Sequence, residues 1–293
     1  MRIAILGGAG RMGKLLVRDL ASRNNSLVVS DPDTAHIKKL KEKRCIELAD
    51  TNRQAVSDAD AVIVAVPMKM TGAVIREVVS DMKTGAILCE ISSVKHRVHE
   101  ILKDLGREDI SPLCVHPLFG EGASCIAKRL ALIPVFDRAR EEEMTAGLFP
   151  EYEICVVSLE EHDRIMAMTI SLPYFVNLIV TSVFQKENLA RLQMLGGTTF
   201  KMQLVLAGSV MFNSCILHED LHRHNPYTIG VLKEFQAEVE TALMNLLNEG
   251  ADFRKFCRGI KAGLREAVNV RQKYEEMYHF LTFLEECNSE LAP

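Results

Sequence analysis

The feature that most constrains the fold is a regular alternation, across the first half of the chain, of short apolar runs with amphipathic stretches of helical period. This rhythm is typical of βαβ units, which build a parallel sheet. The runs contain almost no polar residues, as expected for strands that are buried on both faces. The expected strands are RIAIL, SLVVS, AVIVAV, AILCEI and PLCVH, with further strands at LALIPVF and EICVV.

The pattern changes completely after Val157. Ser158 followed by Glu161 is a capping box, which predicts a helix from about Leu159. Beyond it, apolar residues recur every three or four positions, which predicts about five or six helices. Pro173 should kink or interrupt the first of them, because proline removes a backbone donor. We therefore expect an α/β domain over residues 1–158 and an all-α domain over residues 159–293, packed directly together.

Composition excludes several classes of protein. The 293 residues carry 35 Lys and Arg against 39 Asp and Glu, a net charge of -4, so the basic surface of a nucleic-acid binder is missing. The apolar run after Met1 is too short for a signal sequence or a membrane span. We expect a cytoplasmic protein without a membrane partner. The eight cysteines include no C-x-x-C pair and are expected to be reduced core residues.

A glycine-rich turn follows the first strand in RIAILGGAGRMGKLL. Gly8, Gly10 and Gly13 have G-x-G-x-x-G spacing between a strand and a helix, which is typical of the dinucleotide-binding turn of a Rossmann domain. We expect Gly8 to permit the tight turn, Gly10 to let a pyrophosphate approach the backbone, and Gly13 to let helix and strand pack closely. Arg11 and Met12, between these glycines, belong to the same expected cofactor-binding turn.

Asp31 ends the second strand at close to the roughly 20-residue spacing expected after the glycines. A carboxylate here accepts hydrogen bonds from ribose hydroxyls and repels a 2'-phosphate, so NAD is favoured over NADP. The alternative is that Asp31 only forms a turn before Pro32.

Three later strand ends carry further candidates, because ligands of open α/β sheets bind outside the carboxyl ends of the strands. Val66 and Pro67 would provide apolar backbone beside the nicotinamide, or form a simple strand-to-helix turn. Ser92 and Ser93 would give hydroxyl groups to a substrate, or cap the next helix. His116 would transfer a proton near neutral pH, or be a buried structural histidine.

The segment HEDLH, from His218 to His222, fits the H-E-x-x-H pattern of zinc peptidases. Asn225 and Pro226 follow at once and predict a helix end, and no distal ligand motif is evident. We favour a solvated helix end and expect no metal site.

The combination of GGAGRMG, SSVK, HPLFG and EHDRIMA resembles the prephenate and arogenate dehydrogenases of tyrosine biosynthesis over nearly the whole chain. The resemblance implies that His116 accepts the proton of the substrate hydroxyl and that Ser93 contacts the same hydroxyl. It also implies dimerisation through the helical domains. A homodimer agrees with the apolar stretch of Met202, Leu204, Val205, Leu206, Val210 and Met211.

Two positions depart from the family pattern. Phe200 and Lys201 match the aromatic and basic pair of the middle helical region, and Lys201 is expected to bind a substrate carboxylate. The arginine that grips this carboxylate in the family is here Val205 or Ser209, depending on the branch used for alignment. At a position where the family commonly has a histidine, this chain has Tyr174.

The resemblance implies an NAD-dependent prephenate dehydrogenase, an oxidoreductase that makes 4-hydroxyphenylpyruvate. Three alternatives stay open. The first alternative is that the substrate is arogenate, and the second is that it is another small carboxylic acid. The third is that the chain is a non-catalytic regulatory protein that binds NAD.

Overall fold

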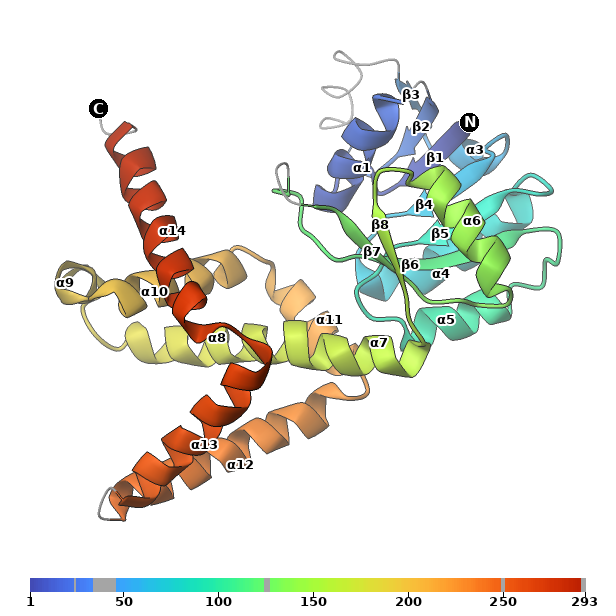
Figure 1. Ribbon diagram of the computed structural model, residues 1–293. Coiled ribbons are helices and arrows are strands. Elements are labelled where there is room, and N and C mark those ends of the chain that lie inside the picture. The colour runs from blue at the N-terminus through green and yellow to red at the C-terminus, as the bar shows by residue number, and fades with distance from the viewer. Residues whose placement is uncertain (24, 34–45, 124–126, 249–250, 291–293) are drawn as a thin grey trace. The chain divides into compact units, whose positions relative to one another are not determined.

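A computed structural model describes residues 1–23, 25–33, 46–123, 127–248 and 251–290 (Figure 1). The chain forms two compact units: Met1–Ala167 with Glu219–Tyr227, and Met168–His218 with Thr228–Pro293. The first unit thus extends past the expected boundary at residue 158. It does so because His162, Asp163 and Met166 of the next helix are buried in it, and because the Asn225 amide donates to the carbonyl of Asp163 at 2.6 Å.

The first unit is built on one eight-stranded sheet in the order β3-β2-β1-β4-β5-β6-β7-β8. Neighbouring strands from β3 to β6 pair in parallel, whereas β7 is antiparallel to β6 and parallel to β8. The α/β class is confirmed, but the sheet is mixed and not all-parallel, because β7 runs antiparallel to β6. The strands are β1 Arg2–Leu6, β2 Ser26–Ser30, β3 Ile46–Leu48, β4 Ala61–Val64, β5 Ile87–Glu90, β6 Ser111–Pro117, β7 Arg129–Leu132 and β8 Glu153–Val156.

Helices cover both faces of this sheet, so the strands are buried on two sides, as their composition predicts (Figure 1). Successive residues of one strand enter different cores: Ala4 and Leu6 pack on one side, and Ile3 and Ile5 on the other. The helices of this unit are α1 Arg11–Ala21, α3 Asn52–Val56, α4 Met68–Val78, α5 His96–Lys103, α6 Arg138–Leu148 and α7 Leu159–Met166, with a 3-10 turn at Val79–Asp81.

The described residues after Ser158 form eight α-helices, more than the five or six expected, since short helices such as α9 carry little periodic signal. The helix start is confirmed, because the Ser158 hydroxyl accepts from the amide of Glu161 at 3.2 Å. The interruption is confirmed too: a π-helical turn at Ala167–Ser171 precedes Pro173. The helices after this turn are α8 Leu172–Phe184, α9 Leu189–Leu195, α10 Thr198–Met211, α11 Cys215–His224, α12 Thr228–Leu247, α13 Ala251–Ala267 and α14 Val270–Glu290.

In the second unit α8 packs on α10, and α12 packs on α13. The helical stretch Leu159–Phe184 is long and apolar enough to cross a membrane by length and composition, and only 17% of its most apolar window is buried. Core helices of soluble proteins pass the same test, so this stretch does not establish a membrane partner.

Candidate active site

The glycine turn between β1 and α1 needs its glycines for three different reasons. Gly7 has φ +85°, a left-handed conformation, so the tight turn is at Gly7 and not at Gly8 as expected. A Cβ on Gly8 would lie 2.2 Å from Val29 Cγ1. A Cβ on Gly13 would lie 2.2 Å from the carbonyl oxygen of Gly7, which confirms the close helix and strand packing predicted there.

Gly10 is the N-cap of α1 and is the least crowded of these glycines, since a Cβ added to it would lie 3.2 Å from Gly7 O and 3.8 Å from Ala65 O. The first N–H groups of a helix have no acceptor within the helix, and the first turn of α1 holds no acidic residue. This end of α1 therefore suits an anionic ligand. Arg11 Nε donates to Glu121 Oε1 at 2.8 Å, while Met12 packs on the apolar core beside α1.

Asp31 ties the end of β2 to the glycine turn. One carboxylate oxygen accepts from the amide of Ala9 at 2.9 Å, and the other accepts from the amide of Asp33 at 2.8 Å. Asp31 therefore stabilises the turn, as the alternative interpretation of this residue predicts. Each carboxylate oxygen has two lone pairs, so these bonds leave acceptor capacity for hydroxyl groups.

The other candidates lie at the ends of the adjacent strands β4, β5 and β6. Val66 is half-buried and its Cγ1 lies 3.0 Å from the position that a Cβ on Gly7 would take, so it borders the glycine turn. Pro67 is exposed and is the N-cap of α4. Because Glu90 pairs with Cys114 in a parallel register, Ser92 is level with His116, and the structure brings these strand ends together.

Ser92 and Ser93 have different surroundings. The Ser92 hydroxyl donates to Glu90 Oε2 at 2.7 Å, and this buried glutamate also pairs with the ammonium of Lys95. Ser92 is thus held by a buried ion pair. The half-buried Ser93 hydroxyl makes no hydrogen bond to any other residue of the described ranges. Of the two, Ser93 is better placed to bind a substrate.

The ion pair itself was not expected from the sequence. Lys95 and Glu90 are fully buried, Lys95 Nζ also donates to the carbonyl of Val115, and Cys114 Sγ donates to Glu90 Oε1 at 3.0 Å. Burial and the Glu90 carboxylate raise the pKa of the Cys114 thiol, which stays protonated.

His116 is buried, with 4% of its surface exposed, and its ring contacts a second histidine. His116 Nδ1 lies 3.0 Å from His162 Nε2, and His162 Nδ1 lies 2.8 Å from Asp163 Oδ1. His162 and Asp163 both belong to the segment EHDRIMA, but the sequence pattern gave neither of them a role in the site. Burial, the Lys95 ammonium and the His162 ring hold the pKa of His116 well below its ordinary 6.5, so His116 is neutral at neutral pH.

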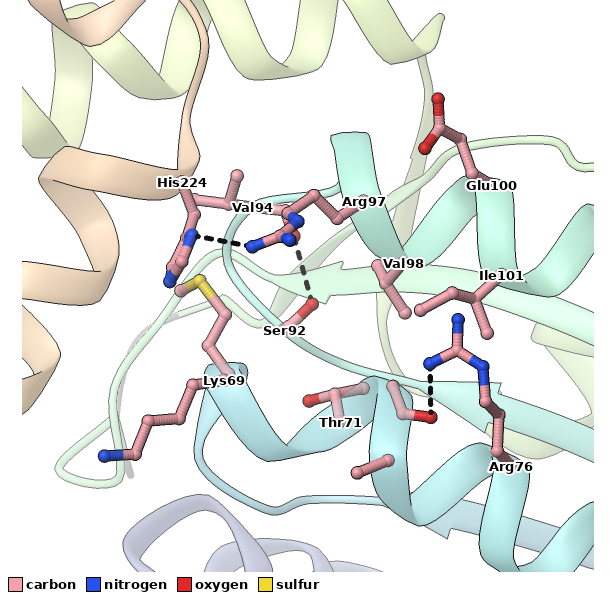
Figure 2. Close-up of a pocket in the computed structure, with 13 residues that line it drawn as sticks. Lys69, Thr71, Arg76, Ser92, Val94, Arg97, Val98, Glu100, Ile101 and His224 are labelled. Carbon is pink, nitrogen blue, oxygen red and sulfur yellow. Dashed lines mark hydrogen bonds between the residues drawn. The ribbon is translucent and has the colours of Figure 1, made fainter.

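A pocket of about 450 Å³ lies beside these strand ends, between α4 and α5 (Figure 2). Lys69, Arg76 and Arg97 give it a basic character, and Arg97 lies 3.5 Å from His224 Nδ1. Ser92 lines this pocket, but Ser93 and His116 do not. The proton-transfer candidates are therefore not inside it.

The HEDLH segment has structural contacts of its own. His218 is buried with Nε2 3.1 Å from the carbonyl of Val210, and Glu219 pairs with Arg223 at 2.7 Å. The helix ends at His224, as predicted, but this end is partly buried and not solvated, since Asp220 and Asn225 are 6% and 2% exposed. Within the described ranges, no group of three or more His, Cys, Asp or Glu could hold a metal ion.

The cysteines only partly fit the expected core positions. Cys89 and Cys114 are buried, Cys155 and Cys287 are half-buried, and the described cysteines are free thiols. Cys215 and Cys257 are exposed, which corrects the expectation for these two. Cys45 and Cys125 lie outside the described residues.

The second unit holds Lys201, the expected carboxylate-binding residue, and Tyr174, which departs from the family pattern. Lys201, on α10, pairs with Glu285 of α14 at 2.8 Å, and both side chains are largely exposed. Tyr174 packs against His218 with ring centroids 5.5 Å apart.

The sheet, the glycine turn and the strand-end residues define a nucleotide-binding domain of the dehydrogenase type. Residues 17–135 match the family described as "Prephenate dehydrogenase, nucleotide-binding domain", a range that includes Asp31, Ser93 and His116. The match and the relatives described below confirm the resemblance of the chain to prephenate and arogenate dehydrogenases.

Known proteins extend the similarity beyond this domain. A probable arogenate/prephenate dehydrogenase of Methanocaldococcus jannaschii is 22% identical over 77% of this chain, which spans 52% of that relative. A crystal structure of Aquifex aeolicus prephenate dehydrogenase, in complex with hydroxyphenyl propionate and NAD+, has a TM-score of 0.75 at 16% identity over 92% of this chain and 98% of that one. Synechocystis arogenate dehydrogenase has a TM-score of 0.70 at 17% identity over 92% of this chain and 100% of that one. Both structures share the fold.

Proposed function

We propose that the protein is an NAD-dependent prephenate dehydrogenase that converts prephenate to 4-hydroxyphenylpyruvate with loss of carbon dioxide. The observation that carries the proposal is His116, a buried histidine of lowered pKa at the end of β6, beside the serines that follow β5. A neutral imidazole is the form that accepts a proton.

The cofactor would be held by the glycine turn and by Asp31. The backbone at Gly10 and the first N–H groups of α1 suit a pyrophosphate, and the Asp31 carboxylate suits a ribose diol. Val66 and Pro67 would border the nicotinamide, and NAD would supply the hydride acceptor when bound. The NAD+ named for the Aquifex aeolicus structure supports this choice.

In the proposed reaction His116 removes the proton of the ring hydroxyl while a hydride leaves the ring carbon that carries this hydroxyl. Ser93 would donate a hydrogen bond to that oxygen and orient it. The ring ketone that results loses its carboxylate and becomes aromatic. The residues of this chain thus have to bind, orient and deprotonate, and the product ring makes the step irreversible.

Substrate recognition rests on fewer residues. Lys201 would bind a carboxylate as a point charge, in exchange for its partner Glu285. Ser92 would contribute mainly by holding the loop that carries Ser93. Arogenate is the first alternative substrate, and the names of the related proteins include both activities. Another small carboxylic acid, or a regulatory role without turnover, is a further alternative.

We further propose that the protein is a homodimer in the cytoplasm. Large apolar side chains of the helical unit are exposed in the single chain, among them Met194, Phe212, Leu247 and Ile260. Surfaces of this kind mark protein interfaces in soluble proteins. A second copy, contacting through its own helical unit, would cover them.

The test is NAD+ reduction, followed by absorbance, with prephenate and arogenate side by side, for the unmodified protein and His116→Asn. We expect turnover with prephenate and a fall in kcat of roughly 10²- to 10⁴-fold in the variant, with an unchanged dissociation constant for NAD. The melting temperature of the same sample identifies a folded variant. Near-normal turnover in folded His116→Asn contradicts the role of His116. Intact NAD binding without turnover on either acid favours a regulatory protein, and turnover only on arogenate moves the assignment to that substrate.

A further inference from the structure

His116 is the first of three buried groups joined in a row. His162 and Asp163, at the start of α7, are each 1% exposed. The contacts run from His116 Nδ1 to His162 Nε2 at 3.0 Å and from His162 Nδ1 to Asp163 Oδ1 at 2.8 Å. The two imidazole rings meet edge to face, with an interplanar angle of 78°.

The direction of each hydrogen bond follows from Asp163. Asp163 Oδ1 accepts from the amide of Lys95 at 3.0 Å, and Oδ2 accepts from the amide of His96 at 2.9 Å. A backbone amide can only donate, so both oxygens of Asp163 act as acceptors. His162 Nδ1 therefore carries the hydrogen of the bond to Asp163.

The second histidine then sets the state of the first. A neutral His162 with its hydrogen on Nδ1 has a bare Nε2, which can only accept. His116 must donate to it from Nδ1, and the hydrogen of a neutral His116 is thereby placed on that nitrogen. His116 Nε2 is left with a free lone pair.

We propose that His162 and Asp163 are positioning residues that fix the tautomer and the ring orientation of His116, so that its Nε2 is the proton acceptor of the reaction. This proposal rests on the proposed function of His116. The tautomer itself follows from the contacts within the first unit and can be measured without turnover.

The charges around the two rings agree with this arrangement. The charged groups that face them are Lys95 before α5, Glu90 on β5 and Asp163 on α7. Burial lowers the pKa of His162, and Lys95 opposes a positive charge on either ring, so both histidines are neutral before the reaction.

The row of groups also provides for the proton that His116 takes up. When Nε2 binds the substrate proton, both nitrogens of His116 are protonated. Transfer of the Nδ1 hydrogen to His162 Nε2 moves the positive charge to the ring that contacts the Asp163 carboxylate. Protons balance, because one enters at His116 Nε2 and one leaves His116 Nδ1.

Asp163 has a structural role as well, since it binds the amides of Lys95 and His96 at the start of α5. Its removal would disturb α5, so His162 is the better residue to change. His162→Gln keeps a side-chain oxygen that can accept from His116 Nδ1. His162→Leu removes that acceptor. His99→Gln is the matched control, because His99 is equally buried but contacts the carbonyl of Pro134 instead.

The first measurement is the ¹⁵N chemical shift of the imidazole nitrogens in histidine-labelled protein without substrate, with signals assigned through His116→Asn and His162→Gln. We expect His116 and His162 to be neutral at pH 7.5 with the hydrogen on Nδ1. A hydrogen on Nε2 of His116 overturns the proposal. This result is independent of activity, so it stands even if neither prephenate nor arogenate is turned over.

The second measurement is the dependence of kcat on pH. We expect His162→Leu to lower kcat roughly 100-fold, with the KM for prephenate and the dissociation constant for NAD changed by less than about threefold. His162→Gln should recover most of kcat with a shifted pH profile. His99→Gln should leave the profile in place, whatever its effect on melting temperature. A folded His162→Leu with the kcat and pH profile of the unmodified protein overturns the positioning role.

Discussion

The two compact units bury their apolar residues to very different degrees. In the first unit the central strands are sealed, with Ile5 and Ile63 at 0% exposure, and the buried Lys95 and Glu90 form an ion pair. In the second unit Phe212 is 73% and Leu247 is 84% exposed. Both units have apolar sequences, so the pattern of hydrophobic residues alone does not say what will cover them. The helical unit thus exposes large apolar side chains, whereas the central strands of the α/β unit are covered.

A matched pair of truncations tests how deeply each unit buries its apolar residues. Ile63→Ala, in β4, should destabilise the protein by about 2–5 kcal/mol, because it leaves a cavity in a sealed core. Ile260→Ala, on α13 and 57% exposed, should cost less than about 0.5 kcal/mol in a separate chain. Urea-induced unfolding at one protein concentration measures both. A large cost at Ile260 would mean that an assembly buries it.

A second variant tests the assembly directly. Leu243→Glu combined with Met244→Glu adds two charges to exposed apolar positions of α12. If a second copy covers this helix, the dissociation constant of the dimer should rise roughly 100-fold or more, because unpaired charges are costly to bury. Light scattering at micromolar concentration reports the mass. Asn248→Glu is the control for added charge. An unmodified protein that is monomeric at this concentration contradicts the proposed homodimer.

The first unit should respond at its cofactor site without any change in assembly. Asp31→Ala should weaken NAD roughly tenfold, since a hydrogen bond to a charged group contributes about 1.5–3 kcal/mol. The preference for NAD over NADP should narrow, because the charge that repels a 2'-phosphate is gone. Titration calorimetry with both nucleotides measures this. An unmodified protein that already prefers NADP contradicts the role given to Asp31.

Acid should destabilise the first unit through its buried histidines. The pKa values of His116 and His162 are lowered in the folded state, so below about pH 6.5 the unfolded chain binds more protons than the folded one. Stability from these groups is present above that pH and falls as the pH drops, by at most about 1.4 kcal/mol per pH unit for each histidine. Melting temperatures from pH 8 to 5 should fall less steeply in His116→Asn. A melting temperature that rises on acidification would contradict this sign.

The sequence was sufficient for the parts of the fold with local signals. The strands of the first half other than β3, the capping box at Ser158 and the interruption before Pro173 were predicted. The direction of β7 was not, because strand composition does not record orientation. The short strand β3 has too few residues to give a pattern.

The candidate site was predictable where a residue lies at or just after the end of a strand, as His116 and Ser93 do. His162 and Asp163 are a histidine and an acid on a helix, a pattern that usually describes a solvated face. Only the tertiary contact with His116 distinguishes them. Lys95 is similar, since a lysine in a loop is rarely expected to be fully buried.

The hydrogen bond from the Cys114 thiol to the Glu90 carboxylate affects how this protein responds to thiol reagents and oxidants. Only a thiolate reacts readily, and burial together with nearby Glu90 keeps the thiols of Cys89 and Cys114 protonated. Among the described cysteines, Cys215 and Cys257 are exposed and lie on helices of the second unit. A maleimide dye would therefore label these surface positions and leave the interior of the sheet unmodified. The protein thus has natural attachment points for a fluorescent probe that reports on its helical unit.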